Sequence, residues 1–185
     1  NHYRYPEFNR KINQIILSLK SEIKQALSNF ELFNLFKNNK LVLLFLFENE
    51  IITVDEKISK ILLQKNDTSF GHFFYPEIKP FISEEERTRI EKEMKKKNEN
   101  IFDNFDEKRK NGQNESYICS LIRNDSIEDF ISHVNRTNLS LSNSVIENSI
   151  FETNPFLKQK NPTLIEYASF FGSIQIINNN ILLYQ

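Results

Sequence analysis

The stretch PTLIEYASFFGSIQII, residues 162–177, carries the clearest structural signal in this chain. Thr163 and Glu166 have the spacing of a capping box, in which two side chains satisfy the free amides at a helix start. Gly172 suits the end of that helix, because glycine enters the left-handed conformation without a steric cost. Ser173 can then cap a second helix. The stretch therefore predicts two short helices that meet at a tight turn.

A similar block lies upstream. LIRNDSIEDF (121–130) aligns with ASFFGSIQII (168–177) at a constant offset, which is 47 residues from Asp125 to Gly172. A chain rich in isoleucine can match itself by chance. Here, however, signals for a helix, a turn and a second helix recur together, and this favours a true repeat over coincidence.

The stretch resembles a degenerate ankyrin repeat, whose signature is Thr-Pro-Leu-His-x-Ala with a glycine four residues later. The signature positions that are kept are Thr163, Ile165, Ala168 and Gly172. Leu164 and Glu166 replace the proline and the histidine. The offset of 47 residues exceeds the ankyrin period of about 33, so a longer connection is expected between the two units.

The chain is also similar, over residues 117–177, to an ankyrin-repeat-related family of unknown function that is expanded in protists. The motifs that carry this similarity are YICSLIRNDSIEDF (117–130), SIFETN (149–154) and TLIEYASFFGSIQI (163–176). The resemblance implies an all-α fold, with a helical leader over residues 1–110 and degenerate ankyrin-like helix pairs over 116–185, the start of an α-solenoid. HFFYPEI (72–78) matches the leader. Further repeats would be expected after Gln185, so the chain is interpreted as truncated.

Composition narrows the possible functions. The net charge of −1 gives no bulk attraction to nucleic acid or to an anionic membrane, and neither is expected as a partner. The single cysteine, Cys119, excludes an internal disulfide framework and a zinc site of several cysteines. The longest apolar run, residues 41–47, is shorter than the roughly 20 residues that span a bilayer. With no signal-peptide pattern in the charged opening, a cytoplasmic location is expected.

Helices are predicted along most of the leader. An apolar stripe at three- and four-residue spacing predicts one helix over residues 6–29. Residues 41–48 are apolar on every side, which fits either a buried strand or a buried helix, and the helical neighbours favour the helix. Capping-box spacing predicts helix starts at Thr53 and at Ser83, and the second of these helices is expected to reach about residue 108.

Residues 66–80 are predicted to be irregular, because Gly71, Pro76 and Pro80 punctuate them. This segment is unusually rich in aromatic side chains, which are Phe70, Phe73, Phe74 and Tyr75. They are interpreted as anchors that hold the segment on the neighbouring helices, in preference to a ligand-binding cage.

Residues suited to enzyme chemistry are sparse. The three glycines lie far apart, which excludes a phosphate-binding loop. His2, His72 and His133 lack metal-binding spacing. Cys119 and His133 can approach each other across a helix hairpin, but nothing marks an activated thiolate, so Cys119 is assigned to the core. We therefore expect no catalytic residue, no cofactor and no metal ligand.

The leading hypothesis is a non-enzymatic protein–protein interaction module of ankyrin-like type, with an unidentified protein as partner. The alternatives are a truncated product without a separate function and an uncharacterised enzyme built on the leader. A buried polar pocket around His72 would favour the enzyme.

The C-terminal face is expected to be uncovered, since no later repeat buries its apolar side chains, which are Ile174, Ile177, Ile181, Leu182 and Leu183. Self-association through this face, and fraying of the last helix from about Asn178, are therefore predicted.

Overall fold

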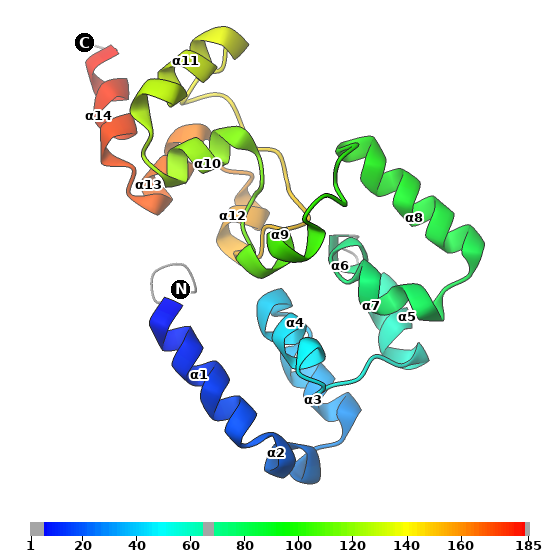
Figure 1. Cartoon of the computed structure of the whole chain (residues 1–185). Coiled ribbons are helices and arrows are strands. Elements are labelled where there is room, and N and C mark those ends of the chain that lie inside the picture. The colour runs from blue at the N-terminus through cyan, green and yellow to red at the C-terminus, as the bar shows by residue number, and fades with distance from the viewer. Residues whose placement is uncertain (1–5, 65–68, 184–185) are drawn as a thin grey trace. The chain divides into compact units, whose positions relative to one another are not determined.

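The chain divides into two compact units, with the boundary between Ile101 and Phe102. The computed structural model describes residues 6–64 and 69–183 (Figure 1). Within these ranges the regular elements are helices, apart from an isolated antiparallel bridge between Val145 and Thr163. The all-α prediction is therefore confirmed.

The described helices of the first unit are α1 (Pro6–Ser18), α2 (Lys20–Ala26), α3 (Asn29–Phe36), α4 (Lys40–Glu48), α5 (Glu56–Gln64), α6 (Ser69–Phe73), α7 (Tyr75–Ile78), the 3₁₀ helix η1 (Lys79–Phe81) and α8 (Glu84–Lys97). Several large apolar side chains from these helices are fully shielded from solvent, among them Phe33, Leu43, Ile58, Leu62, Phe73 and Phe74. The unit therefore has a hydrophobic core of its own.

Residues 6–26 form two helices where the periodicity predicts one helix over 6–29. Leu27 is extended, with φ −131° and ψ 138°, so the second helix cannot continue through it. The Ser28 side chain accepts a hydrogen bond from the Glu31 amide, and Glu31 caps the Ser28 amide in return, which starts α3 separately. The single-helix prediction is therefore wrong in two places. Leu19, with φ −101° and ψ 11°, separates α1 from α2, and the cap at Ser28 begins a new helix after Leu27.

The apolar run at residues 41–48 is helical, as predicted, and forms most of α4. The Asn39 side chain accepts a hydrogen bond of 3.1 Å from the Val42 amide and caps the first turn of α4.

The next helix, α5, starts at a different cap from the one predicted. Asp55, not Thr53, caps it, because the Asp55 carboxylate accepts a hydrogen bond of 2.8 Å from the Ile58 amide.

Residues 69–81 are helical, which corrects the prediction of an irregular segment. Pro76 and Pro80 lie in the first turns of α7 and η1, where the missing N–H of proline has no intrahelical partner to lose. Gly71 lies inside α6, where a β-carbon would come 3.6 Å from the Leu62 carbonyl oxygen of α5. The interpretation of the aromatic side chains as anchors is confirmed, since Phe73 and Phe74 are fully buried.

The helix that follows Ser83 is shorter than predicted. Ser83 and Glu86 form the expected capping box, but α8 ends at Lys97 and Asn98 is extended. Asn104 then adopts the left-handed conformation, with φ 52°, and α9 begins one residue later. This conformation suits asparagine and interrupts a helix, which explains why the helix does not reach residue 108.

The second unit contains α9 (Phe105–Asn111), α10 (Tyr117–Arg123), α11 (Ile127–Thr137), α12 (Pro155–Lys160), α13 (Leu164–Phe171) and α14 (Ile174–Leu183). Phe105 on α9 packs edge-on against Phe151, with ring centroids 5.2 Å apart. Thus α9 packs with the second unit, whereas the sequence assigned residues up to 110 to the leader. The core of the helix pairs includes Cys119, Ile122, Phe130, Tyr167, Ala168 and Ile176.

The two aligned blocks adopt the same backbone pattern of helix, left-handed residue and helix. Asp125 has φ 51° and its counterpart Gly172 has φ 74°. The Ser126 amide donates to the Leu121 carbonyl, and the equivalent Ser173 amide donates to the Ala168 carbonyl, each at 3.0 Å. The alignment at an offset of 47 residues therefore describes a structural equivalence.

The last helix does not end at the asparagine run, because α14 continues through residues 178–180 to Leu183. Fraying from Asn178 is therefore not observed in the backbone. The side chains of Ile181, Leu182 and Leu183, on which the prediction of an uncovered apolar face partly depends, lie outside the described part of the chain.

Candidate functional site

The four signature residues have structural roles in the second unit. Thr163 forms the predicted capping box with Glu166, and Gly172 ends α13 in the left-handed conformation. Ala168 is fully buried, which permits the close packing of α13 on α10 and α14. The amide of Ile165 donates to the Leu141 carbonyl at 3.0 Å. These residues shape the helix pair and present no reactive group.

A carboxylate in the first helix pair caps a helix in the second. Asp125 accepts hydrogen bonds from the Gln175 amide at 3.0 Å and from the Ile176 amide at 3.1 Å, at the N-terminus of α14. A negative charge at this end of a helix also interacts favourably with its dipole. The sequence pattern predicted Ser173 as this cap. That assignment is wrong, because the Ser173 hydroxyl donates to the Ile122 carbonyl instead, at 2.5 Å.

The contacts of Asp125 with α14 and of Ser173 with Ile122 hold the two helix pairs in register. Ser173 is almost completely buried, so its hydrogen bond to Ile122 lies in the interface between the pairs. Helix α10 packs against α13, and α11 packs against α14. Figure 1 shows the four helices side by side, with α10 and α13 adjacent.

A buried polar network closes one end of this interface. The Arg123 guanidinium donates to the Tyr167 hydroxyl and to the Asn114 carbonyl, both at 2.8 Å. The Asn114 side chain, which is 4% exposed, donates to the Glu147 carbonyl at 2.9 Å. The buried Glu152 carboxylate accepts from the Asn114 amide at 3.2 Å. The network thus links α10, α13 and the two loops that precede residues 117 and 155.

This network was not predicted from the sequence, although one signal for it exists. Arg123 is a charged residue that immediately follows the apolar pair Leu121 and Ile122 at the end of α10. A half-buried arginine needs acceptors, and its partners lie up to 44 residues away in the chain. Only the folded structure identifies those partners.

Cys119 is a core residue, as predicted. Its side chain is fully buried, and burial raises the pKa of the thiol against the opposing charge of Arg123. The thiol is therefore protonated at neutral pH and is a poor nucleophile. His133 contacts the ring of Tyr117, with centroids 5.2 Å apart, so it is oriented by an aromatic neighbour.

The long connection between the helix pairs is tied to the start of α13. The Ile146 amide donates to the Pro162 carbonyl at 2.9 Å, and the Leu164 amide donates to the Ser144 carbonyl at 3.1 Å. Val145, between these contacts, is 53% exposed. The connection therefore presents an apolar side chain on a backbone that is fixed by its own hydrogen bonds.

The first unit contains a buried histidine. His72 is 5% exposed, and its Nε2 lies 3.4 Å from a Glu93 carboxylate oxygen. No hydrogen-bond partner for its Nδ1 is found among the described residues. Burial lowers the pKa of His72, the Glu93 hydrogen bond opposes this effect, and the charges of Lys97 and Lys40 lower the pKa further. The neutral imidazole is therefore favoured in the folded unit.

We expect the first unit to lose stability as the pH falls below about 6.5, because the unfolded chain then binds a proton that the folded His72 resists. The measurement is the urea concentration at the midpoint of unfolding, which circular dichroism monitors at several pH values between about pH 7 and pH 5. In a His72→Gln variant this dependence should become shallower, while titrating carboxylates keep a residual slope. Equal pH dependence of the two proteins would contradict the assignment.

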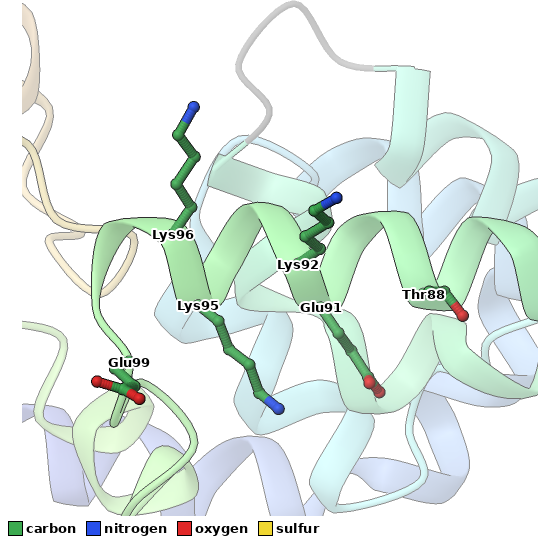
Figure 2. A pocket seen from close by; sticks show the side chains of 6 residues that line it. All are labelled: Thr88, Glu91, Lys92, Lys95, Lys96 and Glu99. Carbon is green, nitrogen blue, oxygen red and sulfur yellow. The ribbon is translucent and has the colours of Figure 1, made fainter.

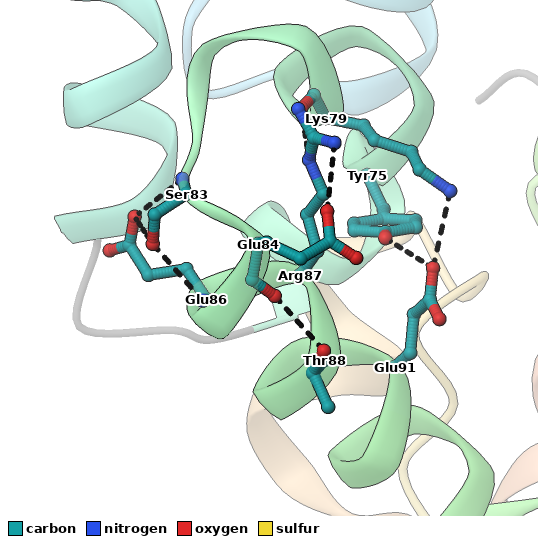
Figure 3. Close-up of polar contacts among 8 residues, drawn as sticks. All are labelled: Tyr75, Lys79, Ser83, Glu84, Glu86, Arg87, Thr88 and Glu91. Carbon is teal, nitrogen blue, oxygen red and sulfur yellow. Dashed lines mark hydrogen bonds and ion pairs between the residues drawn. The ribbon is translucent and has the colours of Figure 1, made fainter.

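Polar contacts fix η1 and α7 against α8 (Figure 3). The Tyr75 hydroxyl donates to the Glu91 carboxylate at 2.5 Å, and the Lys79 ammonium contacts the same oxygen at 3.2 Å. The hydrogen bond from Tyr75 is the main cause that lowers the pKa of Glu91. Arg87 donates to the Lys79 carbonyl at 3.0 Å. These contacts are intramolecular and explain the packing of α8.

An open groove of about 750 Å³ follows the outer side of α8, lined by Thr88, Glu91, Lys92, Lys95, Lys96 and Glu99. Figure 2 shows that Lys92 and Lys96 point to one side of the helix, whereas Glu91 and Lys95 point to the other. Because these side chains do not converge, the groove offers no set of groups that would hold one ligand. His72 does not line it.

Metal-binding clusters and membrane-spanning helices are both absent from the described ranges, 6–64 and 69–183. Within them no group of three or more histidine, cysteine, aspartate or glutamate side chains is arranged to hold a metal ion. None of the helices in those ranges combines the length and the apolar character that a membrane crossing requires. The interface between the two helix pairs is therefore the best-organised candidate site. No protein-family model, curated protein or solved structure matches this chain.

Proposed function

We propose that this chain is a non-enzymatic protein-binding module whose two helix pairs stack in the manner of ankyrin repeats. The observation that supports the proposal most is the pair of hydrogen-bonded contacts across the stack, from Asp125 to α14 and from Ser173 to Ile122. They hold consecutive helix pairs in one register, which is how repeat proteins build an extended binding surface.

The surface proposed to contact a partner is the connecting segment, residues 138–150. In stacks of this kind the loops between helix pairs project toward the partner. Here the loop backbone is anchored to the start of α13, and this reduces the ordering cost of binding. Val145 provides an exposed apolar side chain on it.

The proposal is tested with a photo-reactive residue at the exposed position Asn143 and an extract of the cells that produce the protein. We expect a cross-linked protein partner whose yield falls at least about tenfold on Val145→Asp, because a charge would have to be desolvated at the contact.

Leu35→Asp is the matched control, since Leu35 is 64% exposed in the first unit and the substitution adds the same charge. It should leave the yield unchanged, and circular dichroism should report equal helix content for all three proteins. Equal loss of capture in both variants, or capture that neither variant changes, would contradict this binding surface.

A further inference from the structure

The inner edge of the first helix pair is built to receive a second pair. Cys119 and Ile122 on α10 are fully buried, and the Ile122 carbonyl accepts the Ser173 hydroxyl. Asp125, at the turn, supplies the carboxylate that caps α14. Two apolar side chains and one helix cap thus hold the next pair in place.

The equivalent edge of the second pair lacks all three features. At the offset of 47 residues, Cys119 corresponds to Glu166, Ile122 to Ser169 and Asp125 to Gly172. Glu166 and Ser169 are exposed. Gly172 has no side chain that can cap a following helix.

The polar groups on this edge are already used by α13 itself. The Glu166 carboxylate accepts from the Thr163 amide at 2.8 Å and from its hydroxyl at 3.1 Å. The Ser169 hydroxyl donates to the Ile165 carbonyl at 2.8 Å. A helix pair stacked here would have to desolvate the Glu166 carboxylate without offering it a new partner, and this opposes stacking.

We propose that the outer edge of α13 is a polar edge, which accepts neither a further helix pair nor a second copy of this chain. It concerns the α13 edge, whereas self-association through the apolar side chains of α14 stays a prediction. Ile174, which is 64% exposed, lies at the start of α14 and not on α13. The proposal concerns stacking alone and holds whether or not the connecting segment binds a partner.

The test is sedimentation velocity of the full chain in reducing buffer, over a wide range of concentration. Ser169→Arg places a charge on the edge and should leave the sedimentation profile of the wild type unchanged. The triple variant Glu166→Cys/Ser169→Ile/Gly172→Asp gives α13 the edge residues of α10. It should shift the distribution from the monomer mass of 22.0 kDa toward twice that mass.

Circular dichroism establishes whether the triple variant is folded. If it is not, Ser169→Ile alone is measured, and a smaller shift in the same direction is expected, because only one apolar contact is supplied. The proposal is overturned if Ser169→Arg dissociates an assembly that the wild type forms. It is equally overturned if the folded variant with the α10 edge associates no more than the wild type.

Discussion

Replacing Phe74 by alanine is expected to lower the free energy of unfolding of the first unit by about 3–5 kcal/mol, the usual cost of removing a fully buried aromatic ring. Phe74 packs against Phe73 with ring centroids 4.9 Å apart and against Phe47 on α4 at 5.5 Å. The ring thus joins short helices that are unstable in isolation. Urea unfolding followed by circular dichroism measures the loss.

The matched control is Phe81→Ala, which removes the same ring from η1, where it is 41% exposed. Its cost should stay below about 1 kcal/mol, as for most exposed substitutions. Hydrogen exchange should accelerate across residues 70–78 in Phe74→Ala and not in Phe81→Ala. Similar losses in the two variants would mean that α6 and α7 are not held by the buried ring.

Local signals predicted the helix starts at Ser83 and Thr163, because a capping box is complete within four residues. The left-handed turn at Gly172 was also predictable, because a glycine directly follows the predicted helix. Each of these features depends on residues that are neighbours in the chain.

The helices over residues 69–81 were not predictable in this way. Proline and glycine there indicate an interruption, yet Pro76 occupies a helix start and Gly71 lies inside α6. What stabilises these short helices is the burial of their aromatic rings by α4 and other elements, a tertiary effect that outweighs local propensity.

The interface between the helix pairs was predictable only in part. The alignment of Asp125 with Gly172 identified the turn, and aspartate is one of the few residues that tolerate a left-handed conformation. Its second role, as the cap of a helix 50 residues away, depends on how the pairs stack. The hydrogen-bond partners of Arg123 were not predictable for the same reason, since they also depend on how the pairs stack.

Replacing Asp125 by alanine is expected to lower the free energy of unfolding of the second unit by about 2–3 kcal/mol. The loss has two sources, which are the missing cap on the Gln175 and Ile176 amides and the strain of alanine at φ 51°. Urea unfolding measures the total, and hydrogen exchange at the amides of residues 175 and 176 reports the loss of the cap directly.

Three comparison variants separate these sources. Asp125→Gly removes the carboxylate without backbone strain and should cost about 1–2 kcal/mol. Asp125→Asn keeps an acceptor and tolerates the left-handed conformation, so it should cost less than about 1 kcal/mol. Asp129→Ala removes another acidic residue from the same helix pair, at an exposed position in the first turn of α11, and should have a small effect.

The order of these losses decides what the carboxylate contributes. If Asp125→Gly unfolds at the same urea concentration as the wild type, the hydrogen bonds to α14 add nothing, and the contrast between Asp125 and Gly172 loses its energetic basis. If alanine, glycine and asparagine cost the same, neither the cap nor the strain accounts for the loss. A ranking with alanine most costly and asparagine least assigns Asp125 to the cap that joins one helix pair to the next.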